Sequence, residues 1–164
     1  MRRSMLCAVA VGVSACSASP PHLDAEHASA VRDSVSEYVA GVAHRVSTGG
    51  PTAWLTEFVN DSTFFMVADG HMAFPDYTSM SRFLPGFARA TPSIALDLST
   101  VRVDPLAPGL ALFGANYHET LTDSTGHRML DSGYVTAVAI HSPLGWRLRD
   151  AHWSHPDPVI APHK

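Results

Sequence analysis

Four long apolar runs, separated by short turn-like segments, fill the second half of the chain and constrain its fold more than any other feature. The runs are Ile94 to Val103, Leu110 to Leu121, Arg128 to Ile140 and Trp146 to Trp153. The segments between them, 104–109, 122–127 and 141–145, contain the Asp, Pro, Gly and Ser residues that favour turns. Each run is longer than an ordinary strand of about five or six residues. The pattern predicts an antiparallel meander whose last strand is Gly145 to Pro156.

Helix signals precede this meander. After Asp24, a suitable N-cap, valines recur every three or four positions, as on the buried face of an amphipathic helix. Pro51 suits the first turn of a second, shorter helix. A third helix is expected from Tyr77, and Pro85 is expected to kink or end it. The valines of the first helix are Val31, Val35, Val39, Val42 and Val46.

A short hairpin is predicted between the second and third helices. Residues 62–68 are rich in strand formers, Asp69-Gly70 is a turn signal, and His71 to Phe74 would be the partner strand. Helices followed by long antiparallel strands indicate an α+β domain. We therefore expect the N-terminal helices to pack in the concave face of a strongly curved, cone-like sheet made of the four-strand meander and the hairpin.

The first residues resemble a bacterial lipoprotein leader. Arg2 and Arg3 precede a short apolar run, Met5 to Val13, and small residues then lead to Cys16. A run of about nine residues is too short to cross a bilayer, which needs about twenty. The lipobox resemblance implies cleavage before Cys16 and lipid attachment there. Ordinary cleavage near Ala15 or Ala18 would instead release a secreted protein.

The sequence thus divides into a signal peptide (1–15), a lipidated tether (16–23), one domain (24–156) and a Pro-rich tail (157–164). We expect a membrane-anchored lipoprotein that faces the periplasm or the cell exterior and touches the membrane only through its lipid. Without Arg2 and Arg3, nine basic residues stand against fifteen acidic ones, a net charge of −6 with neutral histidines. This charge disfavours nucleic acid and anionic lipid as partners.

The order of these elements, and the closing run Gly-Trp-Arg-Leu-Arg-Asp-Ala-His-Trp-Ser, resemble the SnoaL-like branch of the nuclear transport factor two-like superfamily. The resemblance covers roughly residues 24–156 and implies the cone-shaped α+β fold. The family contains isomerases, cyclases, dehydratases and hydrolases as well as binding domains without catalysis. The fold therefore does not select the chemistry. A homodimer through the outer sheet face would explain why both faces carry apolar residues.

The resemblance also implies which residues line the cone. In the family's isomerases the last strand ends in Ala, an aromatic residue, Trp and Ser, which matches Ala151 to Ser154, and the Ala and the Trp line the pocket. Ala151 and Trp153 should then point inward, and strand alternation adds Arg149. The opposite face should carry Leu148, Asp150 and His152.

The same comparison argues against the isomerase reaction. The position of the general base falls on Met66, and that of the oxyanion-binding acid falls near Ala137. A thioether and a methyl group cannot act as a base or an acid, so enolisation by that route is not expected.

Ten histidines invite a metal or acid–base interpretation. The nearest pairings are His118 with Glu119 and His152 with His155. The members of each pair have opposite parity in a regular strand and would point to opposite faces, so no metal site is expected. Asp150 and His152 share a strand face and could form an acid–base dyad, or could lie on the outer face in a dimer contact. Asp131 has the strand parity of Ala137 and is the better pocket candidate. No nucleophile elbow, phosphate loop or dinucleotide fingerprint occurs, so no cofactor is expected.

These arguments lead to three hypotheses. The first is a binding domain for a small apolar or amphipathic molecule, with no evident catalysis. The second is an acid–base enzyme of the isomerase, dehydratase or hydrolase type that uses Asp131 or the Asp150–His152 pair. The third is an interaction module whose pocket is filled by its own side chains. The expected ligand-binding residues are Trp54, Phe64, Met66, His71, Tyr117, Asp131, Ala137, Arg149, Ala151 and Trp153.

Overall fold

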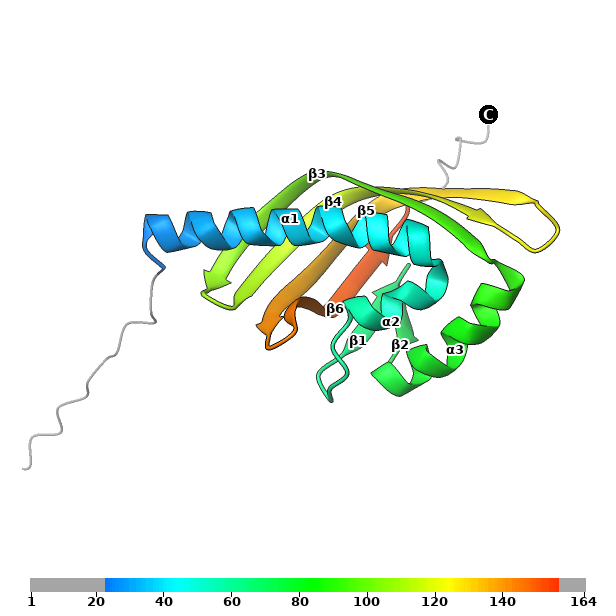
Figure 1. The fold of residues 1–164 in the computed structure, drawn as a ribbon, viewed down its shortest axis with the longest axis horizontal. Coiled ribbons are helices and arrows are strands. Elements are labelled where there is room, and N and C mark those ends of the chain that lie inside the picture. The colour runs from blue at the N-terminus through cyan, green and yellow to red at the C-terminus, as the bar shows by residue number, and fades with distance from the viewer. Residues whose placement is uncertain (1–22, 157–164) are drawn as a thin grey trace, which may run out of the picture.

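One curved sheet of six strands, in the order β2-β1-β6-β5-β4-β3, forms the body of the protein (Figure 1). The computed structural model describes residues 23–156; the predicted signal peptide, Cys16 and the Pro-rich tail lie outside them. The helical elements are α1 (Ala25–Gly49), η1 (Pro51–Ala53), α2 (Trp54–Glu57) and α3 (Tyr77–Ala90). The strands are β1 (Phe65–Ala68), β2 (His71–Phe74), β3 (Ser93–Ala107), β4 (Leu110–Thr122), β5 (Arg128–Ser142) and β6 (Gly145–Ser154).

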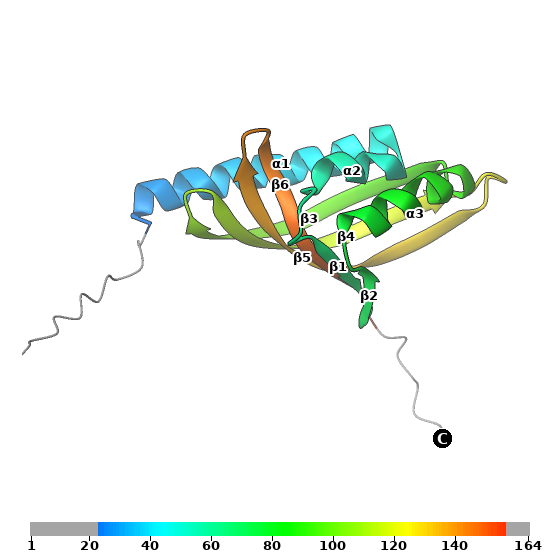
Figure 2. The same cartoon turned by 90° about the horizontal axis from the view of Figure 1, so that it is seen from below.

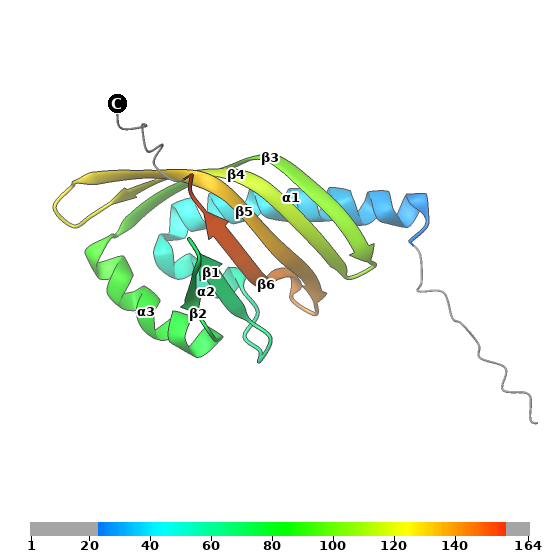
Figure 3. The ribbon, with the colours of Figure 1, turned by 180° about the vertical axis from the view of Figure 1, so that it is seen from behind.

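The predicted α+β cone is confirmed. Strands β3, β4, β5 and β6 pair in sequence order as an antiparallel meander, and each is longer than the apolar run that predicted it, β3 most of all. The helices lie on the concave side of the sheet (Figure 2), and none of the helices of residues 23–156 lies on the outer face seen from behind (Figure 3). Within residues 23–156, no helix combines the length and the apolar character that a membrane crossing needs.

Helix α1 follows the sequence prediction closely. The Asp24 carboxylate accepts a hydrogen bond from the His27 backbone N–H at 2.8 Å and so caps the first turn. All five valines of the predicted stripe are buried. Because valines at this spacing share one face, α1 lies with that face against the inside of the sheet.

The hairpin has the predicted turn and an additional connection. Asp69 and Gly70 both have positive φ, 49° and 78°, as a tight two-residue turn of type I′ requires. Strand β1 also pairs with β6, in the parallel direction. The Asp69 N–H donates to the Trp153 carbonyl at 3.0 Å, so the turn is tied to the end of the last strand.

Pro85 does not end α3, contrary to one of the two expected outcomes. The helix runs through it for 14 residues, from Tyr77 to Ala90. Proline removes one N–H from the helix, while Met80 and Leu84 remain buried on the same apolar face. Burial of these side chains offsets the missing hydrogen bond.

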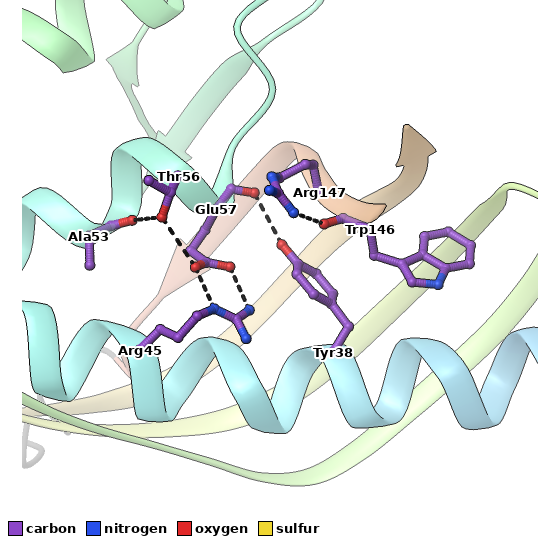
Figure 4. Close-up of polar contacts among 7 residues, drawn as sticks. All are labelled: Tyr38, Arg45, Ala53, Thr56, Glu57, Trp146 and Arg147. Atoms are coloured by element: carbon purple, nitrogen blue, oxygen red, sulfur yellow. Dashed lines mark hydrogen bonds and ion pairs between the residues drawn. The ribbon is translucent and has the colours of Figure 1, made fainter. Parts of the chain in front are cut away.

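An ion pair between the half-exposed Arg45 and the buried Glu57 fixes α2 against α1. Glu57, 2% exposed, receives two hydrogen bonds from Arg45: Nε to Oε1 at 2.7 Å and Nη2 to Oε2 at 2.8 Å (Figure 4). The Tyr38 hydroxyl donates to the Glu57 backbone carbonyl at 3.1 Å, and the Arg45 guanidinium lies over the Tyr38 ring. The hydrogen bond with Glu57 raises the pKa of Arg45. The planar Arg45 guanidinium and the Glu57 carboxylate have opposite charges and form two hydrogen bonds, a geometry that strengthens the ion pair.

Candidate functional site

A cavity of about 350 Å³ opens between α3, the β1–β2 hairpin and the concave face of the sheet. Its walls are mostly apolar, with side chains from α2, β1, β2, α3, β3, β4, β5 and β6. Residues distant in sequence therefore meet here because the sheet curls toward α3. Aromatic side chains make up much of the wall: Trp54, Phe58, Phe74, Phe83, Phe87 and Trp153.

Trp153 is the aromatic centre of this wall. Its indole packs edge-on against Tyr117, with ring centroids 4.9 Å apart, and against Trp54, with centroids 5.7 Å apart. These perpendicular arrangements are the favourable ones for aromatic pairs. They fix the ring positions while leaving the cavity open.

Four ionisable side chains border the cavity, and three of them meet on two adjacent strands. Tyr117 and Glu119 alternate with outward residues on β4, and Glu119 stands directly opposite Asp131 of β5. Residues paired in this way share a sheet face, with Cβ atoms typically about 5 Å apart. The fourth is Asp69, in the β1–β2 turn. Three carboxyl groups therefore border the same apolar space, and two of them, Glu119 and Asp131, are paired on adjacent strands.

Hydrogen bonds hold Asp131 in place. The Tyr117 hydroxyl donates to its Oδ2 at 3.1 Å, and the Ser132 N–H donates to its Oδ1 at 2.8 Å. Burial, and then the negative charge of Asp131, raises the pKa of the Tyr117 hydroxyl. Tyr117 is therefore a neutral donor beside a carboxylate.

Glu119 differs from an ordinary surface glutamate. Burial, with a further contribution from the charge of Asp131, raises its pKa from 4.5 to about 7. At neutral pH the Glu119 carboxyl is thus divided between its protonated and ionised forms.

No cation balances this pair within residues 23–156. The ion pairs of that part of the chain involve Asp24, Glu57, Asp69 and Asp150, but neither Glu119 nor Asp131. The same residues contain no group of three His, Cys, Asp or Glu side chains that could hold a metal ion. A second hollow of about 450 Å³ borders the two carboxyl groups as well, where Asp97 and His118 flank them.

Solved structures share the fold of this chain at low sequence identity. An NTF2-like superfamily protein from Salmonella enterica serovar Typhimurium is 14% identical, with 85% of this chain and 97% of that chain covered and a TM-score of 0.62. A protein from Streptomyces avermitilis, named as a candidate dehydratase of the NTF2-like family, is 15% identical with 77% and 97% covered and a TM-score of 0.64. The chain has the NTF2-like fold.

A third structure, named as a candidate scytalone dehydratase from Novosphingobium aromaticivorans, is 9% identical, with 77% of this chain and 85% of that chain covered and a TM-score of 0.65. No protein-family model matches the sequence, and no curated protein matches it either. At these identities the likeness concerns the NTF2-like fold alone, so the chemistry must be argued from the cavity.

Half of the expected ligand-binding residues border the cavity of this NTF2-like domain. They come from α2, β1, β4, β5 and β6, and the structure brings them together around one space. They are Trp54, Met66, Tyr117, Asp131 and Trp153.

Three other expected lining residues are buried elsewhere. Phe64 packs edge-on against Phe58, with ring centroids 5.0 Å apart, and belongs to the core. Ala137 and Ala151 are paired on adjacent strands and are also core residues. Packing closes their part of the sheet in the described chain, and the cavity lies toward α3 and the hairpin. The prediction that these three line the pocket is wrong.

The prediction that Arg149 points inward is also wrong. Val138 pairs with Asp150 while Ala139 pairs with Leu148, so Arg149 is an extra residue in a β-bulge. Because of this bulge, the residues of β6 that precede Arg149 face the side opposite to the one expected. Leu148, expected on the outer face, is buried in the core. Arg149 Nε instead lies 3.0 Å from Asp150 Oδ2.

His71 and the proposed dyad lie away from the cavity wall. His71 is exposed on β2, with its ring nitrogen 2.8 Å from the Asp69 carbonyl. Asp150 pairs with Phe65 and His152 pairs with Val67, on the outer face of the sheet. No hydrogen bond joins Asp150 to His152 in the described chain, so the structure does not assemble them as a dyad at the cavity.

Glu119 is the principal residue that the sequence-based list omits. Glu119 and Tyr117 are two positions apart on β4 and therefore share a strand face. The prediction that Tyr117 lines the cavity thus implied that Glu119 points inward too. Its partnership with Asp131 depends on the register between β4 and β5, which the sequence does not show.

Proposed function

We propose that this chain is a SnoaL-like domain that binds a small apolar or amphipathic molecule in the cavity beside Trp153. The observation that carries the proposal is an open space of about 350 Å³ with aromatic walls and one polar cluster. Ligand sites typically have volumes of about 300 to 1,000 Å³ and a few convergent polar groups. Trp54, Met66 and Trp153 border this space without filling it, which disfavours the interaction module with a self-filled pocket.

A cavity-filling variant tests this proposal. Ala73 lies on β2, is exposed and borders the cavity, so Ala73→Trp should block the space without disturbing the core. Calorimetric titration with naphthol, a small planar probe, should show at least about tenfold weaker binding than in the unmodified protein. Ala40→Trp, at an exposed position of α1, is the matched control. Equal binding by both variants would place the probe elsewhere and refute the proposal.

A specific observation favours acid–base catalysis as a second candidate function. Asp131 can accept a proton, while the Tyr117 hydroxyl and the protonated form of Glu119 can donate one, all bordering one apolar cavity. This arrangement does not use the isomerase positions, where Met66 and Ala137 stand. It supports proton transfer on a bound carbonyl compound.

Deuterium exchange tests this second candidate. Incubation of tetralone in deuterated buffer should give faster exchange of its acidic C–H protons with the unmodified protein than with Asp131→Asn. Naphthol binding by Asp131→Asn reports whether the cavity is intact. Exchange at the buffer rate with the unmodified protein would leave binding as the function.

We also propose that the domain is exported and anchored by a lipid on Cys16. The sequence of the leader supports this, as set out above. In a bacterial host, a clickable fatty acid should label the unmodified chain and not Cys16→Ser, and the variant should leave the membrane fraction. Labelling of both proteins, or membrane retention of Cys16→Ser, would contradict the proposal.

Finally, we propose that two copies associate through the outer sheet face. Phe65, Leu112 and Tyr134 are large, exposed apolar side chains on that face, and no helix covers it (Figure 3). Leu112→Glu should convert the dimer to a monomer in light-scattering measurements. A dimer that survives this change would point to a different interface.

A further inference from the structure

We infer that the ligand of this cavity carries a positively charged ammonium group on an apolar body, and that Glu119 and Asp131 receive this group. The inference rests on the proposed function, because it specifies the chemistry of the molecule that the cavity takes. The site is the cavity itself, with its volume and aromatic walls, and the acidic pair determines which polar group can enter it.

The polar side chains that line the cavity are acidic or neutral. Among residues 23–156, the ionisable side chains that border the cavity are Asp69, Tyr117, Glu119 and Asp131, and the lining includes no lysine, arginine or histidine. From α2, α3 and β2 the lining side chains are all apolar. An anionic ligand would therefore be repelled, and a neutral ligand would leave charge in the cavity uncompensated.

The three carboxyl groups of the cavity differ in whether they already have a partner that can carry a positive charge. Asp69 has a partner, because His155 Nδ1 lies 3.1 Å from its Oδ1. Asp131 accepts from Tyr117 and from a backbone N–H, and both donors are neutral. Glu119 has neither an ion pair nor a side-chain hydrogen bond in the described chain. A cation between Glu119 and Asp131 would thus meet charges that nothing else in residues 23–156 neutralises.

The aromatic walls of the cavity also bear on the choice of ligand. Trp153 packs edge-on against both Tyr117 and Trp54 in the cavity wall, and Tyr117 also touches Asp131 of the acidic pair. Aromatic faces attract ammonium groups, and the attraction is strongest where water is excluded. The same walls accept the apolar body of the ligand, so an amphipathic amine satisfies both parts of the cavity.

The state of Glu119 makes this recognition depend on pH. Its pKa of about 7 means that it becomes a carboxylate between pH 6 and pH 8, while an alkylamine stays protonated, as lysine does with a pKa of about 10. Asp69, Tyr117 and Asp131 face Glu119 within the cavity, and Asp97 and His118 border it from the adjoining hollow. Amine affinity should therefore rise as the pH increases through 7.

Three probes of one shape test the inference: phenethylamine, phenethyl alcohol and phenylacetate, titrated calorimetrically into the domain at pH 6 and pH 8. At pH 8 the amine should bind at least about tenfold more tightly than the alcohol, and phenylacetate should bind most weakly. The amine affinity should fall severalfold at pH 6, whereas the alcohol affinity should not change.

Two variants assign the preference to the acidic pair. In Glu119→Gln/Asp131→Asn the amine should lose its advantage while the alcohol binds as before, which also shows that the cavity is intact. Glu37→Gln, on the exposed side of α1, is the matched control and should behave as the unmodified protein.

The outcomes separate the inference from the proposed function. Equal affinities for amine and alcohol, or an amine preference that persists in the double variant, would overturn the inference and leave the binding function in place. Tight binding of naphthol or of the alcohol without any amine binding would do the same. Failure of all probes, naphthol included, would remove both.

Discussion

Two glutamates of this domain have carboxyl groups largely shielded from water, but they differ in whether a cation lies beside them. Glu57 is almost fully buried and receives two hydrogen bonds from Arg45 at 2.7 and 2.8 Å. Glu119 is largely buried as well, but its nearest charged neighbour in the sheet is another carboxylate, Asp131. Arg45 compensates the charge of Glu57, whereas no ion pair of residues 23–156 includes Glu119, and its raised pKa leaves it partly protonated at neutral pH.

The difference follows from what each position contributes. The Glu57–Arg45 contact joins α2 to α1, and this ion pair holds the two helices against each other (Figure 4). Glu119 and Asp131 lie where α3 and the hairpin leave the cone open. Carboxyl groups without a cation in an apolar space reduce stability, and such arrangements are found at functional sites. If Glu119 receives the inferred ligand, the comparison is between a structural charge and a functional one.

The largest effect is expected from breaking the structural pair. Arg45→Met leaves Glu57 buried without a cation, so the free energy of unfolding at pH 7 should fall by about 3 kcal/mol. Urea denaturation measures this change. Arg32→Met, at an exposed position of the same helix, is the matched control and should change stability by less than about 0.5 kcal/mol.

A double variant sharpens that result. Arg45→Met/Glu57→Gln removes the charge along with its partner and should recover part of the loss. If Arg45→Met alone proved as stable as the unmodified protein, the ion pair would not hold α2 in place. Glu57 would then not be a structural charge, and the contrast with Glu119 would fail.

A substitution of Glu119 should raise the free energy of unfolding, whereas Arg45→Met lowers it. Glu119 has a pKa of about 7 in the folded chain and about 4.5 when unfolded, so folding favours its protonated form. Its contribution to stability is fully present below pH 4.5 and is lost as the pH rises through 7. Glu119→Gln removes this loss and should stabilise the domain by about 2 kcal/mol at pH 8 and by little at pH 5.

Denaturant midpoints at the two pH values measure this difference. Glu37→Gln, an exposed position on α1, should give no pH-dependent gain. Destabilisation of Glu119→Gln at pH 8 would show that Glu119 is already compensated, and would weaken the case for a cationic ligand as well.

Much of the fold could be predicted because its signals are local. The valine stripe of α1, the Asp69-Gly70 turn and the alternating meander each depend on a few neighbouring residues, and all three appear as expected. The parallel pairing of β1 with β6 could not be predicted, because strand alternation contains no information about which distant strand becomes the neighbour.

The site was harder to predict than the fold. A single extra residue at Arg149 reversed the alternation of β6, and bulges leave no periodic signal in the sequence. Ala137 and Ala151 point to the core, but which part of the concave face stays open depends on where the helices pack. Glu119 acquires its raised pKa from burial and from Asp131, both consequences of register and packing.

The smallest effects should come from two tyrosine hydroxyls, one in each region. Tyr117→Phe removes a hydrogen bond to the Asp131 carboxylate, and Tyr38→Phe removes one to the Glu57 backbone carbonyl. Bonds to charged acceptors contribute more, so Tyr117→Phe should cost about 1.5 kcal/mol and Tyr38→Phe about 1 kcal/mol or less in urea denaturation at pH 7. The two also differ in function: Tyr117→Phe should alter amine binding in the cavity, whereas Tyr38→Phe should not. An effect of Tyr38→Phe on binding would show that the two glutamate regions are coupled, and that the division between structural and functional charge is not sharp.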